Sequence, residues 1–479
     1  QGTYLVYAEN IYVGYKYYET RYEDAVLGRY NANGTAGAVD SKNGWSYREE
    51  VAFPFGYGKA YTEFTYSDFK CEQKGDDYEI TLTVTNTGNN VGADAVQVYI
   101  QKPYTEHDRQ YGIEQAAVNL CGYAKTSELA VGDHENVTIL VDGTAFRTYD
   151  AEDKKTYIYE AGEYYLTAAE DAHAAVNNIL AAKGKTPANT GNVMDAEGNA
   201  DFVYCVKNGA DNYTKFAESE YTGNSITNRL DEADWNKYSH SDGSKVTYLS
   251  RKDWQGTYPS ATPAFSVNAE MLADLDWDKE VEADPKDTMP LYGQAHKFNL
   301  IDMKGLEYDH TAWNDLLNQL TLNEQIKLLG NAYHGTIKIG SITKPKDLAE
   351  DGPMGVRKEY LNSSGWTLSF PSNVLLAASF NDKLAEEVGE LLGEDMLHSG
   401  VSCLYGPSAN LHRTVYGGRS FEYYSEDGFI SGMMAKAQVI GIQSKGCYVN
   451  MKHYALNDQE SNRYGVAVWA NEQSIREVY

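Results

Sequence analysis

The stretch GFISGMMAKAQVIGIQSKGCYVNMKH, residues 428–453, predicts a helix that leads directly into a buried strand. Apolar residues recur at helical spacing in its first half, and the short apolar run from Cys447 to Met451 has the length of a strand. A helix followed by a buried strand is the repeating unit of a parallel α/β sheet. Lys452 and His453 follow this strand, where a core would leave their charge and polarity unpaired.

Two further helices are expected before this unit. Thr321 and Glu324 have the spacing of a capping box, and Gly330 is the expected stop of that helix. Asn381 can cap a second helix, which leads into a strand from Val401 to Leu404. This repeat is typical of a (β/α)8 barrel, which needs about 250 residues. Because about 170 residues follow residue 305, we expect a barrel that is open or completed by other sequence.

The chain upstream of residue 305 has a different texture. Apolar and polar residues alternate from Tyr78 to Val84 and again from Val96 to Ile100, as in half-buried strands. These and later runs predict a small antiparallel sandwich over residues 63–170. Residues 1–62 are aromatic and turn-rich and too short to fold alone. Residues 171–305 are predicted to be a linker or connector region, with no fold assigned to 200–300.

Charge and composition exclude several functions. The chain has 41 Lys and Arg against 69 Asp and Glu, and its net charge of −28 repels nucleic acid and anionic lipid. Five cysteines without a C-x-x-C pair predict neither a zinc site nor a disulfide framework, so we interpret them as buried free thiols. We expect no metal and no cofactor. Forty tyrosines could stack on sugars, but a structural role in a β-rich protein is the favoured interpretation.

The ends of the sequence predict a piece of a longer polypeptide. Gln1 is not an initiator methionine, and Asn471 to Tyr479 has the pattern of a helix cut in mid-course. No run of about 18 apolar residues occurs and no secretion signal is evident, so the compartment is left undetermined. The acidic surplus and the many tyrosines lean toward a cell-surface setting over the cytoplasm. A homo-oligomer is left open.

Polar residues cluster after three predicted strands, where a barrel of this type places its active site. The segments are DGPMGVR (351–357), the loop 406–427 and MKHYALNDQESNR (451–463). The first could be an ordinary turn and the second a loop held by surface ion pairs. In the third, adjacent Lys and His favour a functional site, because charge in a core is costly.

These segments contain GGRSFEYYSED (417–427) and KHYALNDQESNR (452–463), which resemble the long motifs of glycoside hydrolase family 3. The resemblance is to its β-glucosidase branch rather than its N-acetylglucosaminidase branch. FPSNVLLAASFN (370–381) and WANEQSIRE (469–477) are similar in order and spacing as well. YVGYKYYET (12–20) and FPFGYGKAYT (53–62) look like the end of the family's α/β sandwich domain.

The resemblance implies a multidomain fold, α/β plus all-β, in the reversed, circularly permuted domain order. Residues 1–62 would be the C-terminal end of an α/β sandwich domain, and residues 63–170 a fibronectin type III-like β-sandwich. A connector would occupy residues 171–305. Residues 306–479 would form the N-terminal part of a TIM (β/α)8-type barrel.

It also implies roles for single residues. One set would line the −1 subsite and bind hydroxyls of the nonreducing sugar: Asp351, Arg419, Lys452, His453 and Arg463. Glu422 and Glu460 would orient these cations, and Arg413 would support them.

Retaining hydrolysis needs two carboxylates about 5 to 5.5 Å apart. The resemblance places neither in this chain: the nucleophilic Asp is expected after Tyr479 and the acid/base Glu before Gln1. The parent protein would be an exo-acting β-glucosidase that takes β-linked glucosides or oligosaccharides, with the rest of the enzyme as its partner. The isolated chain would be inactive. A β-xylosidase of the same family and a noncatalytic carbohydrate-binding protein are the alternatives.

Overall fold

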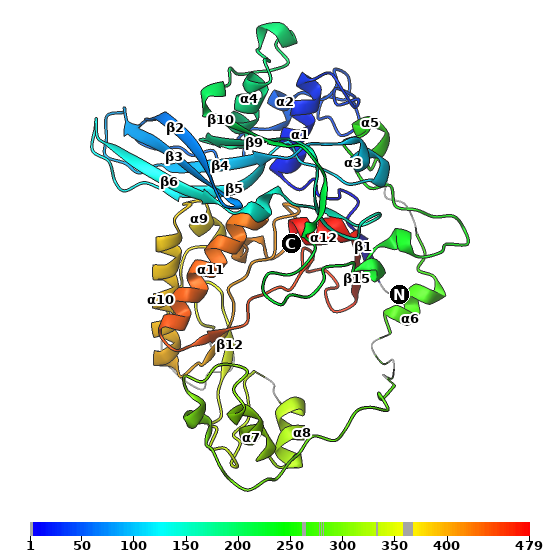
Figure 1. Ribbon diagram of the computed structural model, residues 1–479, viewed down its shortest axis with the longest axis vertical. Helices are drawn as coiled ribbons and strands as arrows, with labels where there is room; N and C mark the ends of the chain where they lie inside the picture. The colour runs from blue at the N-terminus through cyan, green and yellow to red at the C-terminus, as the bar shows by residue number, and fades with distance from the viewer. Residues whose placement is uncertain are drawn as a thin grey trace.

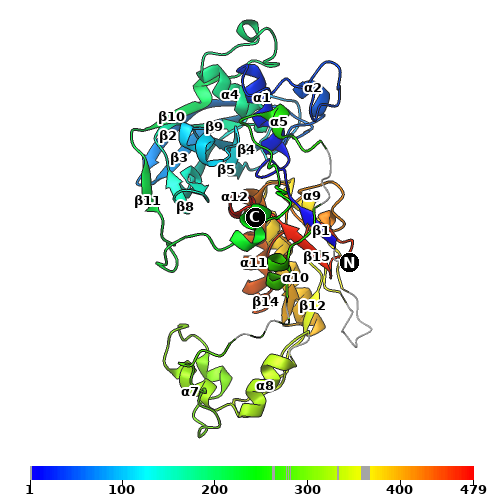
Figure 2. The same cartoon turned by 90° about the vertical axis from the view of Figure 1, so that its right-hand side faces the viewer.

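The computed structural model describes residues 3–260, 265–276, 278, 280, 282–331, 334–357 and 367–479. The chain forms three parts, which are stacked from top to bottom in the view of Figure 1. An upper body holds a β-sandwich with helices packed on it, a middle part holds a parallel sheet with long helices, and a lower lobe holds short helices. Figure 2 shows the lower lobe set apart from the rest. Both chain termini lie beside the middle part.

The β-sandwich consists of two antiparallel sheets. One has the order β2-β3-β6 and the other the order β10-β9-β4-β5. Side chains of β3 alternate between buried and half-buried positions, because one face of the strand packs into the core between the sheets. The predicted strands are confirmed as β3, β4, β6 and β9. The strands are β2 (Phe64–Lys74), β3 (Asp77–Asn86), β4 (Ala95–Gln101), β5 (Asn119–Lys125), β6 (His134–Val141), β9 (Gly162–Ala169) and β10 (Val203–Asn208).

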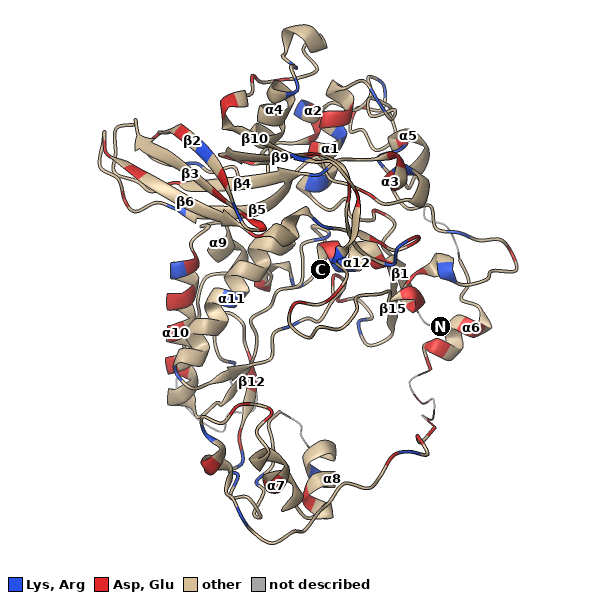
Figure 3. Cartoon of the chain, viewed as in Figure 1, with Lys and Arg blue, Asp and Glu red and all other residues tan. Residues whose placement is uncertain are grey.

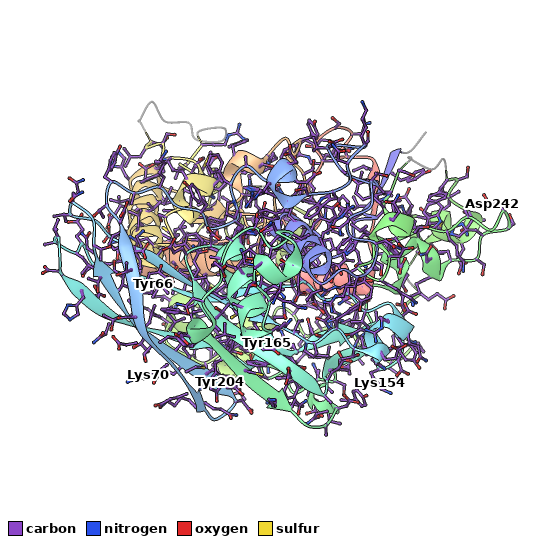
Figure 4. All side chains as sticks on the ribbon, turned by 90° about the horizontal axis from the view of Figure 1, so that it is seen from above. Tyr66, Lys70, Lys154, Tyr165, Tyr204 and Asp242 are labelled. Atoms are coloured by element: carbon purple, nitrogen blue, oxygen red, sulfur yellow. The ribbon has the colours of Figure 1, made fainter. Side chains whose placement is uncertain are left out.

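The second sheet continues beyond residue 170. β10 pairs antiparallel with β9, from Val203 opposite Thr167 to Asn208 opposite Gly162. Between them lies α4 (Ala172–Ala182), whose N-cap Asp171 accepts a hydrogen bond from the amide of Ala174. The region predicted as a connector therefore supplies a helix and an edge strand to the upper body. Viewed from above, Tyr66 and Lys70 of β2 and Tyr204 of β10 mark these edge strands (Figure 4).

α1 (Tyr15–Val26) and α4 pack over this body, and the connector returns to α1. Arg251 of the connector contacts α1 directly. Its guanidinium donates to Glu23 Oε2 at 2.9 Å and to Asp24 Oδ1 at 2.6 Å. The indole N–H of Trp254 donates to Asp24 Oδ2 at 2.8 Å. Connector and helix are thus held together by buried charge.

The middle part is a parallel α/β unit. β12 (Ala349–Asp351), β13 (Cys403–Tyr405) and β14 (Tyr448–Val449) pair in parallel in that order. α10 (Asp382–Ser399) and α11 (Gly428–Ser444) lie side by side against them (Figure 1). Gly389 and Gly441 permit this close packing, because a Cβ at either would meet the other helix's backbone within 2.5 Å. The predicted Asn381 cap is confirmed by its bond from the amide of Leu384.

Barrel closure is not seen among the described residues, where the parallel sheet ends at β12 and β14. β15 (Val466–Trp469) pairs instead in parallel with β1 (Thr3–Val6), and α12 (Glu472–Val478) follows it. The predicted strands around residues 401 and 447 exist, but β14 is shorter than expected.

The lower lobe contains α7 (Ala312–Asn318) and α8 (Leu322–Gly330). The predicted capping box of Thr321 and Glu324 is confirmed, and the helix ends at Gly330, the predicted stop, with Asn331 as its C-cap. Its apolar residues Ile326 and Leu329 lie on the surface. The remaining elements are short: α2 (Tyr47–Glu50), α3 (Glu106–Tyr111), β7 (Thr148–Asp150), β8 (Thr156–Tyr159), β11 (Asn212–Phe216), α5 (Trp254–Thr257), α6 (Ala269–Asp274) and α9 (Asn373–Ala377).

Acidic residues are spread over all three parts, including α10 and α6 (Figure 3). None of the described helices combines the length and the apolar character that crossing a bilayer requires. All five cysteines carry free thiols, but Cys71 and Cys205 are half-buried rather than buried as predicted.

Candidate functional site

The ends of the parallel strands bring the predicted residues together. Asp351 is the last residue of β12, and Lys452 lies just beyond β14, where it forms a parallel bridge with Ser408. Since parallel strands present their carboxyl ends at one edge of the sheet, these side chains meet although they are far apart in sequence. The loop that carries Arg419 and Glu422 covers the same edge.

Lys452 lies between two carboxylates. Its Nζ donates to Asp351 Oδ1 at 2.5 Å and lies 3.7 Å from Glu422 Oε2. Ser408 also donates to Glu422 Oε2, at 3.2 Å. The ammonium group is therefore fixed in position but still reaches the surface, since 13% of the side chain is exposed.

Arg419 joins the carboxylates to the histidine. Its Nε donates to Glu422 Oε1, and its Nη1 donates to His453 Nε2 at 2.9 Å. The same Nη1 lies 3.8 Å from Glu460 Oε1. A guanidinium that is held on two sides keeps a fixed orientation, which suits paired hydroxyl or carboxylate oxygens.

His453 is neutral in this setting. Burial, and then the positive charges of Arg419, Lys452 and Arg463, lower its pKa to about 4. Because Arg419 can only donate, Nε2 accepts, so Nδ1 carries the proton and donates to the hydroxyl of Tyr423 at 2.9 Å.

Asp351 is an anion at neutral pH. Burial raises its pKa, but the hydrogen bond and charge of Lys452 outweigh burial, and the net effect is a pKa below the ordinary value. Arg357 adds a second cation, with Nη1 3.6 Å from Asp351 Oδ2. Burial lowers the pKa of Arg419, but its bond to Glu422 more than compensates and raises it overall.

A cavity of about 540 Å³ opens onto this cluster. Both charges and apolar groups form its walls, so a ligand with hydroxyls and a carbon face fits its chemistry. Six of the lining residues carry the argument: Asp351, Met354, Arg419, Phe421, Glu422 and Arg463.

Glu460 orients the far side of the cluster. Its Oε2 accepts from Arg463 Nη1 at 3.0 Å, and its Oε1 accepts from the amide of Asn457 at 3.0 Å. Asn457 also donates to the hydroxyl of Tyr423 at 2.9 Å. Glu422 and Glu460 thus make the contacts to cations that the sequence predicts.

Arg413 does not join the cluster, contrary to its predicted supporting role. Its guanidinium is buried against Glu9, at 2.8 Å, and donates to the hydroxyl of Tyr479 at 2.8 Å. It also lies over the ring of Tyr7, 4.4 Å from the centroid. Arg413 therefore joins the middle part to the N-terminal segment.

Two site residues were not predicted: Tyr423 and Asn457. Arg357 ends the DGPMGVR segment, one of the three that the sequence singles out, and its guanidinium lies beside Asp351. Nothing in the sequence distinguishes Tyr423 from its neighbour Tyr424. The hydroxyl of Tyr424 donates to Gln438 in α11 and takes no part in the cluster.

A group of metal-ligand type among the described residues lies elsewhere. It consists of His107, Asp150 and Asp153. Their atoms already have partners: Asp150 Oδ1 accepts from the backbone amide of Asp153 at 2.8 Å, and His107 Nε2 lies 2.9 Å from Asp150 Oδ2. Lys154 neutralises Asp153 at 2.8 Å. We assign no metal to it.

Two family models match the chain. Residues 316–479 match the glycosyl hydrolase family 3 N-terminal domain, and residues 94–172 match a fibronectin type III-like domain. The first match contains the whole cluster from Asp351 to Arg463. The part of the chain that carries the cluster is thus similar to glycoside hydrolase family 3.

Three curated relatives match the chain over different lengths. The β-glucosidase of Ruminococcus albus is 28% identical over 99% of this chain and 42% of its own length. β-Glucosidase A of Butyrivibrio fibrisolvens is 29% identical over 99% of this chain and 52% of its own. The thermostable β-glucosidase B of Acetivibrio thermocellus is 37% identical over 34% of this chain and 23% of its own. The chain spans about half the length of the first two relatives.

A solved structure has a similar fold along the whole chain. A β-glucosidase from Paenibacillus barengoltzii superimposes with a TM-score of 0.66 and 23% identity, and the match covers 100% of this chain and 45% of that one. The chain thus shares its mixed α/β fold with that structure, and residues 94–172 match a fibronectin type III-like domain.

Proposed function

We propose that this chain is the sugar-binding part of a retaining, exo-acting β-glucosidase, which releases terminal β-D-glucose from β-glucosides or oligosaccharides. The observation that carries the proposal is a cavity lined by Asp351 and Arg419, which Lys452 and His453 hold by hydrogen bonds. The names of the relatives that match along the chain support the substrate class.

The chemistry of the cluster suits a single neutral sugar ring. The carboxylate of Asp351 can accept from two hydroxyls, while Lys452 and Arg419 can donate to others. Since each cation is already neutralised by Asp351 or Glu422, a neutral ligand adds no unpaired charge. Phe421 and Met354 offer apolar surface to the carbon face of the ring.

We extend the proposal to the fold. The three parallel strands and their helices would be the first units of a (β/α)8 barrel, preceded by the sandwich in the reversed domain order. Two relatives that align along 99% of this chain in its own order support that arrangement. The proposed boundaries are those of the sequence analysis, with α4 and β10 assigned to the sandwich body.

The two catalytic carboxylates would come from the remainder of a longer protein, and the greater length of the relatives supports this. Intact-mass analysis of the native protein tests it. A mass near twice that of this chain, or a companion polypeptide, is expected. A native protein of these 479 residues alone, with no companion, would favour a noncatalytic carbohydrate-binding protein.

The substrate is tested on the intact native protein with aryl β-D-glucosides and aryl β-D-xylosides. We expect a higher kcat/KM for the glucoside, with β-glucose as the first product by NMR, since retention preserves the anomer. Much faster cleavage of the xyloside would show that the family's β-xylosidase activity is the correct one. α-Glucose as the first product would rule out the retaining mechanism.

A further inference from the structure

A second cavity, of about 400 Å³, lies in the upper body. It shares no lining residue with the cavity beside Asp351. Its walls come from α1, from the loop and short helix around α2, and from the segment that follows α4, near the top of Figure 1. Its volume falls within the range of about 300–1,000 Å³ that is typical of small-molecule sites.

Aromatic rings form one side of this cavity and hold fixed positions. Tyr47 stacks on His173, with centroids 3.9 Å apart and planes 15° apart. Trp45 is 4% exposed, and the guanidinium of Arg21 lies 5.1 Å from the centroid of its ring. Rings fixed in this way can offer their faces or edges to the carbon face of a sugar without losing freedom on binding.

Polar groups without partners line the same cavity. The indole N–H of Trp45 is buried and has no hydrogen-bond partner in the described part of the chain. The side chains of Asn33, Ser46 and Asn192 likewise make no hydrogen bond to any described residue. A buried donor without a partner costs free energy, which an oxygen acceptor of a ligand would recover.

The charges at this cavity are balanced. Of the residues that line it, Arg48 and Asp195 are charged, and they face each other: Arg48 Nη2 donates to the main-chain oxygen of Asp195 at 2.7 Å. Arg48 Nε lies 3.6 Å from Asp195 Oδ2. Asp195 Oδ1 accepts from the hydroxyl of Tyr22 and is 2.8 Å from His173 Nε2. A neutral ligand suits this lining better than an anion, which would also meet the net charge of −28.

We propose that this cavity is a second, noncatalytic binding site for a neutral sugar of one or two pyranose units. Free amide, hydroxyl and indole groups provide donors and acceptors for its hydroxyls, and Trp45 and Tyr47 provide the apolar contact. The proposal does not depend on the function of the cluster at Asp351. The site would hold one end of an oligosaccharide on the upper body while the other end reaches the cavity beside Asp351.

The test is calorimetric titration of the chain with cellobiose, in a Lys452→Met background that silences the first cavity. The double change Asn33→Ala and Asn192→Gly removes two exposed polar groups without strain, because Asn192 has a φ of 64° that glycine adopts freely. We expect at least 10-fold weaker binding in this variant. Asn224→Ala, a change at an exposed residue outside the cavity, should leave the affinity unchanged.

Fluorescence gives an independent readout. Cellobiose should change the emission of the Lys452→Met chain, and Trp45→Phe should abolish that change while the thermal melt stays cooperative. Unchanged affinity in the double variant would overturn the proposal, as would equal loss in Asn224→Ala. Competition by glycerol at the concentration of cellobiose would overturn the assignment to sugars. If the Lys452→Met background alone removes all binding, a single sugar site remains and the second site is refuted.

Discussion

Two clusters in this chain each combine cations with carboxylates, but they serve different purposes. Around Arg251, the guanidinium and its partners Glu23 and Asp24 are each no more than 2% exposed. Around Lys452, the side chains of Lys452 and Asp351 are 13% and 26% exposed, and Asp351 lines a cavity. In the first cluster the buried charges pair with one another. In the second they leave one side open to a ligand.

The two histidines with the largest pKa shifts repeat this contrast. His173 lies between Glu19 and Asp195, and although burial lowers its pKa, the bonds to both carboxylates raise it to about 9. His453 faces cations, and burial together with these charges lowers its pKa to about 4. At neutral pH one is a buried cation that holds segments together, and the other is a neutral donor and acceptor beside a cavity.

The largest expected effect comes from breaking the closed cluster. Arg251→Met leaves Glu23 and Asp24 buried without their main partner, although Arg29 and Lys183 still approach them. Removing one member of a buried ion pair costs about 3–5 kcal/mol, so the free energy of unfolding in urea should fall by that amount.

Lys252→Met is the matched control, since Lys252 is exposed and its unfolding free energy should change by less than about 0.5 kcal/mol. Arg251→Met molecules that remain folded should bind sugar as the unchanged chain does. A stable Arg251→Met chain would mean that the cluster is not the tie between connector and α1.

The next effect comes from the open cluster. Lys452→Met should weaken binding of a terminal glucoside by about 100-fold, or about 2.7 kcal/mol, because Asp351 and Glu422 lose the cation that orients them. Calorimetry measures the affinity, and urea unfolding should show a smaller change than for Arg251→Met.

Lys436→Met on the exposed side of α11 is the control and should bind normally. If Lys452→Met lowers stability by several kcal/mol but leaves binding intact, the cluster at Asp351 is structural and the contrast with Arg251 disappears.

Much of the open cluster could be predicted from the sequence, because its members follow strands in recognisable motifs. Asp351, Lys452 and Arg419 were expected together and lie together. The helix starts at Thr321 and Asn381 were also predictable, since a capping residue leaves a local signal.

The remainder depends on contacts between distant segments. Arg413 stands beside the GGR motif in sequence, yet its partners are Glu9 and Tyr479. β10 has little hydrophobic alternation, and only its pairing with β9 makes it a strand. The Arg251 cluster joins residues more than 220 positions apart, so the sequence around Arg251 does not predict its partners.

A smaller effect separates the histidines. His173 holds its proton more tightly in the folded protein, so its contribution to stability is complete below pH about 6.5 and is lost as the pH rises through about 9. The loss should be about 2 kcal/mol between these values, after allowance for partial exposure. Urea unfolding at several pH values measures it.

His173→Gln should remove this slope, while His134→Gln, at an exposed residue of β6, should keep it. An equal slope in His173→Gln would show that other groups titrate in this window and that His173 is not the buried cation.

The smallest expected effect tests whether the carboxylates of the open cluster orient cations rather than stabilise the fold. Glu460 contacts Arg463 at 3.0 Å and Arg419 at 3.8 Å, and its side chain is 28% exposed. Glu460→Gln keeps the shape but removes the charge, so both guanidinium groups should lose orientation. Sugar binding by calorimetry should weaken by about 3- to 10-fold, about 1 kcal/mol, with stability unchanged. Glu387→Gln on the exposed face of α10 should alter neither. Loss of stability without loss of binding would assign Glu460 to the fold, and the open cluster would then extend no further than Arg419.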